Sequence, residues 1–347
     1  MIVERAHKAC VVGSGTWGTA FTGLLAPQCD EVALWCRDPE LARAASVSRR
    51  NPRHLPYYDL ADNVRPTADM AEAVEGAELV VLALPSSHLR RVCRQLAPHV
   101  PSDALVLVLT KGMEPASHKL MDEVAADELG GRDRMAVLTG PNHAEEICRG
   151  QVSAAVVASH DAAVAARIQA LVASPSFRPY VSSDVTGVEV CAAAKNVIAI
   201  ACGIAAGCGA QDNTLAVLMT RGLAEIGRIS AALGGDHLTP MGLAGMGDLV
   251  ATCTSRHSRN RTFGEALVRG ETLAAFEART RMVVEGARAA ESLLELADEK
   301  GIEVPITRAV HGLLVNGFDV EAARESLLGR LPREEFYGMQ GKPGKER

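Results

Sequence analysis

Residues 11–18 read Val-Val-Gly-Ser-Gly-Thr-Trp-Gly, and this stretch decides the fold of the first half of the chain. Gly13, Gly15 and Gly18 follow the GxGxxG pattern, after a short apolar run and ahead of an amphipathic segment. In that context the glycines form the turn between a first strand and a first helix. The free amides and positive dipole end of such a helix bind a pyrophosphate. The stretch therefore predicts a dinucleotide site, although a glycine-rich turn that only connects a strand to a helix has the same composition.

On either side of this turn, short β-branched runs alternate with amphipathic segments as far as residue 181. This alternation is typical of βαβ units and predicts a doubly wound parallel sheet of the Rossmann type. The expected strands are residues 9–12, 31–36, 78–83, 105–109, 135–138 and 154–158. The expected helices are residues 17–26, 39–50, 87–96, 117–128, 143–149 and 162–173.

Beyond residue 183 the strand signal stops, and Ala, Leu, Glu and Gly recur with helical spacing to about residue 328. A chain of 347 residues is long for one core, so two domains are expected. We expect a Rossmann-type dinucleotide-binding domain at residues 1–183 and an all-helical domain with the substrate and catalytic groups at residues 184–336. Residues 337–347 have no apolar periodicity and are expected to be a disordered tail.

Composition excludes several classes of partner. The formal net charge of -6 gives no electrostatic reason to bind nucleic acid or an anionic membrane. The nine cysteines include no CxxC pair, which favours reduced thiols in the cytoplasm and predicts no metal site. The N-terminus lacks the pattern of a signal peptide, which also favours the cytoplasm. Residues 192–210 are apolar but contain Lys195 and several glycines, so we expect a buried helix rather than a membrane span.

The end of the second expected strand bears on the choice of dinucleotide. A site selective for NAD usually has Asp or Glu there, to hold the ribose 2′-hydroxyl. Here the strand is followed by Arg37, whose guanidinium suits a 2′-phosphate and favours NADP. Asp38 next to it leaves NAD open, and an arginine at this place is also compatible with an ordinary solvated surface residue.

Lys195 lies in a long apolar run, where a buried charge is costly. One interpretation is a structural lysine whose ammonium reaches water. The other is a functional ammonium whose pKa burial lowers from about 10.4 toward values useful for proton transfer. Asp248, in a Gly-Met-Gly-Asp turn, would oppose that shift and hold the ammonium, but it is equally compatible with an ordinary turn or a helix cap.

Three further segments carry groups suited to an anionic substrate. Ser258, Arg259 and Asn260 offer a hydroxyl, a guanidinium and an amide within one turn, a set that suits phosphate oxygens, although a solvated helix start has the same composition. Residues 110–112 and residues 140–144 each follow an expected strand. Because ligands of open α/β sheets bind beyond the carboxyl ends of the strands, we expect both loops to border the cofactor crevice.

Eight segments in chain order are shared with one family: GSGTWGTA (13–20), KGME (111–114), GPNHA (140–144), AKNVIA (194–199), TRGLAE (220–225), GMGDL (245–249), SRN (258–260) and VVEG (283–286). With them the chain resembles the bacterial-type NAD(P)-dependent sn-glycerol-3-phosphate dehydrogenases, from about residue 8 to residue 335. The helical domain is accordingly expected to be similar to the C-terminal domain of 6-phosphogluconate dehydrogenase.

The resemblance implies interconversion of sn-glycerol 3-phosphate and dihydroxyacetone phosphate with NADP or NAD, mainly in the reducing direction that feeds glycerophospholipid synthesis. It implies that Lys195 is the catalytic proton donor and acceptor. The implied substrate contacts are Lys111, Gly140, Asn142, Lys195, Asp248, Ser258, Arg259 and Asn260. The implied cofactor contacts, beside the three glycines, are Thr16, Trp17, Arg37, Lys111, Ala144, Arg259, Val283 and Glu285. Small molecules are the expected partners, with a homodimer left open.

Two other functions remain open from the residues alone. The first is a dehydrogenase of the same two-domain architecture, such as a relative of 6-phosphogluconate or 3-hydroxyacid dehydrogenase, that acts on a different hydroxyl group. The second is a regulator that senses the cofactor without turning it over.

Overall fold

The computed structural model describes residues 4–115, 117–315, 318–331, 334–335 and 337–338. The chain divides into two compact units. The sheet unit takes the chain up to Thr110 and again from Met121 to Val185, and the helical unit takes Lys111–Leu120 and the chain from Thr186 onward. The expected boundary at residues 183 and 184 lies two residues before the observed one, and Lys111–Leu120 had been expected in the first domain.

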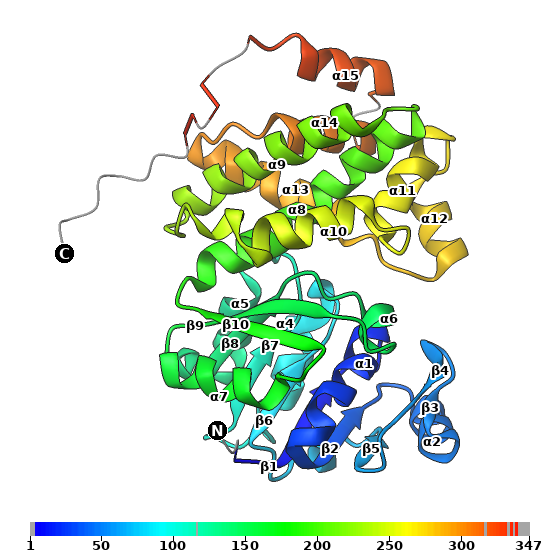
Figure 1. Cartoon of the computed structure of the whole chain (residues 1–347), viewed down its shortest axis with the longest axis vertical. Helices are drawn as coiled ribbons and strands as arrows, with labels where there is room; N and C mark the ends of the chain where they lie inside the picture. The colour runs from blue at the N-terminus through cyan, green and yellow to red at the C-terminus, as the bar shows by residue number, and fades with distance from the viewer. Residues whose placement is uncertain (1–3, 116, 316–317, 332–333, 336, 339–347) are drawn as a thin grey trace, which may run out of the picture. The chain divides into compact units, whose positions relative to one another are not determined.

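The sheet unit is built on eight strands in the order β10-β9-β8-β7-β6-β1-β2-β5 (Figure 1). Their bounds are Ala6–Val12 (β1), Cys29–Trp35 (β2), Val64–Thr67 (β5), Leu79–Leu82 (β6), Leu105–Val108 (β7), Met135–Thr139 (β8), Ser153–Ser159 (β9) and Phe177–Ser182 (β10). The strand order reverses direction at β1, which pairs with β2 on one side and β6 on the other. This switch point is where doubly wound sheets bind their ligands.

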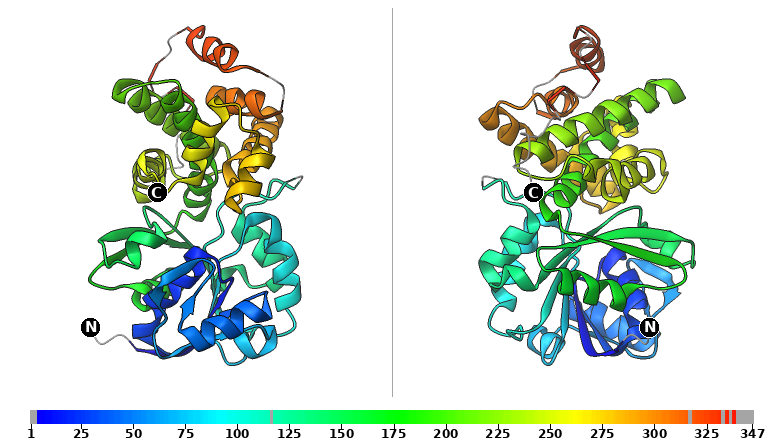
Figure 2. Two further views of the ribbon diagram at one scale, coloured as in Figure 1. Left: turned by 90° about the vertical axis from the view of Figure 1, so that its right-hand side faces the viewer. Right: turned by 60° about the vertical axis from the view of Figure 1, so that its left-hand side comes forward.

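Helices cover both faces of this sheet, as Figure 2 shows. They are α1 (Thr16–Leu25), α2 (Pro39–Ser48), α3 (Met70–Val74), α4 (Ser86–Leu96), α5 (Met121–Leu129), α6 (Ala144–Ile147) and α7 (Ala162–Val172), with short 3₁₀ turns η1 (Ala26–Gln28) and η2 (Arg132–Arg134). All of β6, and β1 from Ala9 to Val12, is apolar and buried, because neither face of these central segments meets water. The predicted doubly wound fold is confirmed.

The sheet differs from the expectation in two respects. β8 pairs with β9 in the antiparallel sense, so β9 and β10 run against the other six strands. β5 and β10 were not expected, and each contains a proline, Pro66 and Pro179, which is tolerated because both strands lie at sheet edges. A separate two-stranded sheet, β3 (Arg50–Asn51) with β4 (Leu55–Asp59), was also missed because its strands are short.

The helical unit consists of α-helices, several of which pack on the long helix that begins at Val185 in the sheet unit (Figure 1). They are α8 (Val185–Gly207), α9 (Asp212–Ala232), α10 (Asp248–Thr254), α11 (Arg259–Val268), α12 (Leu273–Thr280), α13 (Glu285–Lys300), α14 (Pro305–Val315) and α15 (Val320–Leu328), with a 3₁₀ turn η3 (Thr239–Met241) and a π-helical turn η4 (Leu243–Gly247). The length and hydropathy of α8 would suffice to cross a membrane, but 83% of its most apolar window is buried inside the protein. The predicted buried helix is therefore confirmed.

Residues 111–115 and 117–120 form a strap that belongs to the helical unit. The strap closes on itself through a β-bridge between Met113 and Leu120 and a hydrogen bond from the Glu114 amide to the Lys119 carbonyl. Helix α5 begins at Met121 and not at residue 117 as expected, because the strap occupies its predicted first turn.

The expected disordered tail begins with an ordered contact. The guanidinium of Arg228 lies over the ring of Tyr337, 4.6 Å from its centroid, and the Tyr337 hydroxyl donates to Oε2 of Glu303 at 3.1 Å. Tyr337 therefore belongs to the helical unit, contrary to the expectation. Residues 339–347, the rest of the predicted tail, lie outside the described residues.

Candidate active site

The glycine turn of the sheet unit is shaped by close backbone approaches. Gly13 has φ 116°, and a Cβ there would lie 2.4 Å from the carbonyl oxygen of Ala83. A Cβ on Gly18 would lie 1.9 Å from the carbonyl oxygen of Gly13, so no larger residue fits at either position. Gly15 caps α1 without a side chain, and nothing lies within 4 Å of its would-be Cβ. The amides of Thr16, Trp17 and Gly18 at the start of α1 thus meet no capping side chain, which is the geometry that a pyrophosphate needs.

Trp17 and Ala144 lie together beside this turn. The Trp17 ring packs edge-on against Phe21, with 5.3 Å between ring centroids. Trp17 also packs on a small buried cluster of Ala20, Leu55 and Ala144. Its Nε1 is buried without a hydrogen-bond acceptor among the described residues, so a polar ligand atom there would satisfy it.

Arg37 and Asp38, which follow β2, have separate roles. The Asp38 carboxylate caps α2 by accepting from the Glu40 amide at 3.0 Å, and it forms an ion pair with Arg53 at 2.8 Å. The pKa of Asp38 is lowered by the Arg53 hydrogen bond and then by the Glu40 amide. Arg37 is exposed. The carboxylate is therefore already occupied, whereas the guanidinium next to it faces solvent.

Gly140 and Asn142 follow β8, as expected. Gly140 has φ 150°, and a Cβ there would lie 2.7 Å from Cα of Ala155, so the position requires glycine. The Nδ2 of Asn142 is buried and has no acceptor within the part of the chain that the structure describes. A buried amide group without a partner is costly, so an acceptor atom of a ligand at Asn142 would lower the free energy.

The helical unit buries a second set of predicted residues, grouped around one carboxylate. Lys195, on α8, is 5% exposed, and Asp248, the first residue of α10, is 2% exposed. The Lys195 ammonium donates to Oδ1 of Asp248 at 2.6 Å and to the Thr252 hydroxyl at 2.7 Å. Thr252 in turn donates to the main-chain carbonyl of Asp248 at 2.6 Å, so its oxygen is oriented to accept from the lysine.

Lys111, at the start of the strap, completes this cluster. Its ammonium donates to Oδ2 of Asp248 at 2.8 Å, so the two carboxylate oxygens hold one ammonium each. Burial by itself raises the pKa of Asp248, but the two ammonium groups outweigh it and lower the pKa to about 2. Burial lowers the pKa of Lys195 to about 8, with Asp248 opposing this shift and Lys111 adding to it.

We call Lys111, Lys195, Asp248 and Thr252 the lysine cluster. Below pH 8 it contains two ammonium groups and one carboxylate, so it carries a net positive charge in a site that excludes water. Such a site stabilises negative charge that develops on a bound oxygen. Two of the three ammonium protons of Lys195 are used by Asp248 and Thr252, and the third can pass to a ligand.

The remaining predicted contacts form a polar chain through the same unit. Asn260 donates from Nδ2 to Oδ1 of Asn196 at 2.9 Å and accepts at its own Oδ1 from the Gly286 amide at 3.0 Å. Ser258 caps α11, and the exposed Arg259 donates to the Val283 carbonyl at 3.3 Å. These bonds join the starts of α11 and α13, so Asn260, Arg259, Val283 and Glu285 lie close to one another.

The comparisons with known proteins identify the family of this chain. The model of the NAD-dependent glycerol-3-phosphate dehydrogenase N-terminus matches residues 8–165, and that of the C-terminus matches residues 184–325. The chain belongs to this family. A glycerol-3-phosphate dehydrogenase (NAD(P)+) of Frankia casuarinae is 48% identical over 95% of this chain and 98% of the relative, and one of Corynebacterium aurimucosum is 45% identical over 94% and 99%.

Solved structures of glycerol-3-phosphate dehydrogenases share the fold over nearly the whole chain. The enzyme of Coxiella burnetii has a TM-score of 0.88 and 34% identity over 94% of this chain and 99% of its own. The enzyme of Saccharomyces cerevisiae has a TM-score of 0.81 and 26% identity over 93% and 99%. The resemblance drawn from the sequence is thus confirmed.

In this member of the glycerol-3-phosphate dehydrogenase family, the sequence did not predict two polar residues of the helical unit that contact the predicted site residues. Thr252 was not considered, although it lies four residues after Asp248 and so shares its helix face. Asn196 was not predicted as a site residue, but its side-chain oxygen accepts from Asn260. The spacing could have indicated Thr252, but nothing in the sequence indicates the bond between two asparagines that are 64 residues apart.

Proposed function

We propose that this chain catalyses the NAD(P)-dependent interconversion of sn-glycerol 3-phosphate and dihydroxyacetone phosphate. The observation that carries the proposal is the buried Lys195 ammonium held by Asp248 and Thr252, with a pKa near 8, in a chain of this family. A lysine with that pKa exchanges its proton near neutral pH, which is what a carbonyl reduction and its reverse require.

NADP or NAD, when held at the glycine turn of Gly13, Gly15 and Gly18, would supply the hydride for reduction of the substrate carbonyl. Lys195 donates its proton to the carbonyl oxygen, so that the product is an alcohol and no free alkoxide forms. In the reverse direction the neutral amine of Lys195 accepts the hydroxyl proton. Thr252 and Asp248 each accept one N–H of Lys195. The third N–H therefore remains for the reacting oxygen of the substrate.

Lys111 and Asp248 set the charge around this proton. Asp248 raises the pKa of Lys195, and Lys111 lowers it. The net positive charge of the lysine cluster also favours the developing negative charge on the substrate oxygen. We therefore assign Lys111 and Asp248 to substrate binding and to tuning of Lys195.

The phosphate group of the substrate calls for charged donors. We propose that Arg259, with the start of α11 at Ser258, binds the phosphate and thereby orients the carbonyl. Gly140 and the amide of Asn142 are proposed as further substrate contacts. Gly13, Gly15, Thr16, Trp17, Gly18, Arg37, Ala144, Val283 and Glu285 are proposed to hold the cofactor.

The proposed reaction is tested by following NADPH absorbance with dihydroxyacetone phosphate and, separately, with 3-oxoacids. We expect turnover of the triose phosphate at a rate that the oxoacids do not approach. Comparable turnover of the oxoacids, with none of the triose phosphate, would assign the chain to a dehydrogenase of the same architecture that acts on another hydroxyl group.

We also propose a preference for NADP over NAD, because Arg37 faces solvent whereas Asp38 is occupied by α2 and Arg53. The Arg37→Asp variant should lower kcat/KM with NADPH by about tenfold or more and leave kcat/KM with NADH within a few-fold, since a charge-assisted bond to a phosphate is lost. An unchanged NADPH to NADH ratio of kcat/KM in that variant would remove Arg37 from cofactor selection.

In the cell we propose that the enzyme works mainly in the reducing direction, in the cytoplasm, and supplies sn-glycerol 3-phosphate for glycerophospholipid synthesis. We propose a homodimer as its assembly. Light scattering on the purified protein tests the assembly, and the ratio of forward to reverse kcat/KM at neutral pH tests the direction.

A further inference from the structure

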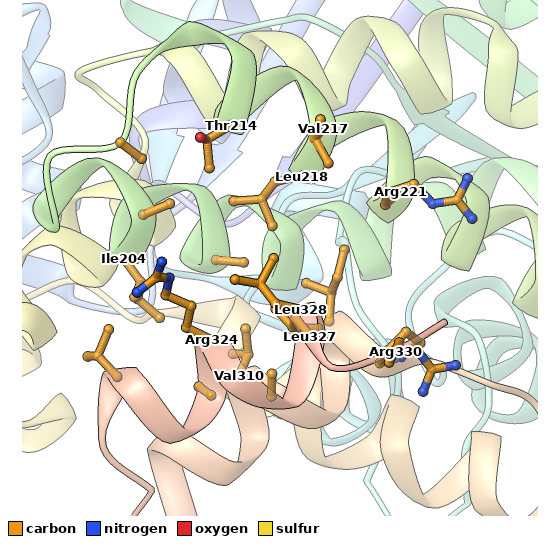
Figure 3. A pocket seen from close by; sticks show the side chains of 18 of the residues that line it. Ile204, Thr214, Val217, Leu218, Arg221, Val310, Arg324, Leu327, Leu328 and Arg330 are labelled. Atoms are coloured by element: carbon orange, nitrogen blue, oxygen red, sulfur yellow. The ribbon is translucent and has the colours of Figure 1, made fainter. Parts of the chain in front are cut away.

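The helical unit contains a groove of about 920 Å³ that is separate from the lysine cluster (Figure 3). It is lined by the C-terminal part of α8 and by α9, α14 and α15. Its volume falls in the range of about 300 to 1,000 Å³ that is typical of small-molecule sites. Ile204, which lines it, lies nine residues beyond Lys195 on α8, or about 14 Å along the helix axis.

The middle of the groove is apolar. Figure 3 shows Leu218, Val310, Leu327 and Leu328 gathered there. Leu328 is 70% exposed, and Val217 on the rim is 60% exposed, although both are aliphatic. A group of exposed aliphatic side chains inside a concavity indicates a surface that an apolar ligand covers.

The ends of the groove are basic. In Figure 3, Arg324 lies toward Ile204, and Arg221 lies with Arg330 toward the opposite end. The lining contains four arginines and two glutamates, Glu225 and Glu321, and a third carboxylate, that of Glu303, lies against Arg330 and Tyr337 of the lining. Arg324 is paired with Glu321 and Arg330 with Glu303, whereas Arg221 donates to the main-chain carbonyl of Glu335, which is a neutral acceptor.

The fourth arginine of the lining is buried. Arg228 is 5% exposed, and its Nε donates to the Glu303 carbonyl at 2.9 Å. Its Nη1 is buried and has no acceptor within the described part of the chain. A buried guanidinium nitrogen without an acceptor is costly, so a nearby anion would lower the free energy of this arrangement.

We propose that this groove binds a single-chain amphiphile with an anionic head group. The apolar chain lies along Leu218, Val310 and Leu328, and the head group lies at the end that holds Arg221 and Arg330. Arg228 lines the same groove. The apolar wall accounts for the chain, and two guanidinium groups account for the sign of the head group: Arg221, whose hydrogen-bond partner is a neutral carbonyl, and Arg228, whose buried Nη1 has no acceptor among the described residues. This site needs no contact with the lysine cluster and does not depend on the proposed reaction.

The test is a displacement experiment on the full chain. The fluorescent fatty acid 11-(dansylamino)undecanoic acid is bound first and then displaced by 1-oleoyl-sn-glycerol 3-phosphate, oleate or 1-oleoylglycerol, each below its critical micelle concentration. The first two differ in the type of anion, and the third is the neutral match of the first. We expect displacement by one or both anions, and about tenfold weaker displacement by the neutral ester, because a charge-assisted bond is missing.

Two sets of variants locate the site. Leu328→Glu places a carboxylate on the apolar wall at an exposed position, and it should weaken probe binding by about tenfold or more. Val47→Glu, at a position on α2 that is 82% exposed and outside the groove, is the matched control and should bind the probe as the unmodified chain does. Arg221→Gln combined with Arg330→Gln should retain the neutral ester and lose the preference for the anions.

The proposal is overturned by equal displacement with the neutral and anionic esters, or by equal probe binding to Leu328→Glu and Val47→Glu. It is also overturned if the unmodified chain does not bind the probe. If Leu328→Glu then converts a dimer to a monomer in light scattering, the groove is covered by a second copy of the chain. None of these measurements uses turnover, so an inactive enzyme would leave this result intact.

Discussion

Lys195 on α8 and Glu225 on α9 are both buried ionisable groups of the helical unit, but their partners differ. Lys195 contacts the side chains of Asp248 and Thr252, which come from another helix, with Lys111 across the carboxylate. Glu225, 1% exposed, accepts from the amides of Ile306 and Thr307 and from the Thr307 hydroxyl, in the first turn of α14.

The comparison teaches that burial and a shifted pKa do not by themselves identify a catalytic group. Burial raises the pKa of Glu225 to about 7, against the hydrogen bonds of Ile306 and Thr307, and it lowers the pKa of Lys195 to about 8. The carboxylate of Glu225 serves as a cap for α14, because it accepts from two main-chain amides and one hydroxyl of the first turn of that helix. Lys195 keeps a proton free for a ligand, because its partners use only two of the three.

The largest expected effect separates these two residues directly. Lys195→Ala should lower kcat for dihydroxyacetone phosphate reduction by about a thousandfold or more, since the proton donor is lost, and should leave the dissociation constant for NADP within a few-fold. Glu225→Gln is the matched control and should keep kcat within a few-fold. Steady-state rates and fluorescence titration with the cofactor measure both. An equal loss of kcat in the two variants would mean that the type of partner does not distinguish a catalytic group from a structural one.

The next effect concerns the partner of Lys195. In the unmodified enzyme kcat for reduction should fall as the pH rises through about 8, because Lys195 loses the proton that it donates. Asp248→Asn removes the group that raises the pKa of Lys195, so this fall should move to lower pH, with a loss of about a hundredfold in kcat at neutral pH.

The readout for Asp248→Asn is the pH profile of kcat, with circular dichroism to verify the fold, because removing one partner leaves two buried ammonium groups facing each other. A profile that keeps its midpoint while kcat falls would show that Asp248 does not set the pKa of the proton donor.

A smaller effect is expected from the strap. His118 has φ 53° and places Nε2 3.0 Å from Glu295 and Nδ1 3.7 Å from Glu299, both on α13. These contacts hold the strap that carries Lys111. His118→Ala should lower kcat/KM about two- to fivefold. It should also raise the pH midpoint of the kcat profile, because Lys111 lies farther from Lys195 and lowers its pKa less.

His118→Gln, which can still donate to Glu295, should restore most of both changes. His237→Ala, at an exposed position of the same unit, is the control and should alter neither. If His118→Ala lowers activity without moving the midpoint, the strap stabilises the unit but does not position Lys111.

The smallest effect on catalysis, and the one that concerns only stability, belongs to Glu225. Its pKa is raised in the folded chain, so its contribution to the free energy of unfolding is full at acidic pH and is lost as the pH rises through about 7. Glu225→Gln should remove about 1 kcal/mol of the decrease in unfolding free energy between pH 6 and pH 8. Urea unfolding at the two pH values measures this, and an unchanged decrease would place the titrating group elsewhere.

Much of the fold was predictable because the signals are local. The six expected strands correspond to β1, β2, β6, β7, β8 and β9, whose apolar β-branched runs are unmistakable in a buried sheet. The glycine turn was predictable because only glycine fits at Gly13 and Gly18. The edge strands and the strap were missed because prolines, short length and the choice of packing partner carry no local periodicity.

The sequence by itself determined the alternation of strands and helices, the turn at the start of α1 and the presence of a lysine in an apolar helix. Only the tertiary structure decided which groups surround that lysine. Asp248 lies 53 residues from Lys195 in the chain, and Lys111 lies 137 residues from Asp248. A pKa depends on the distance between charges and on the exclusion of water, and both are fixed only when distant segments pack together.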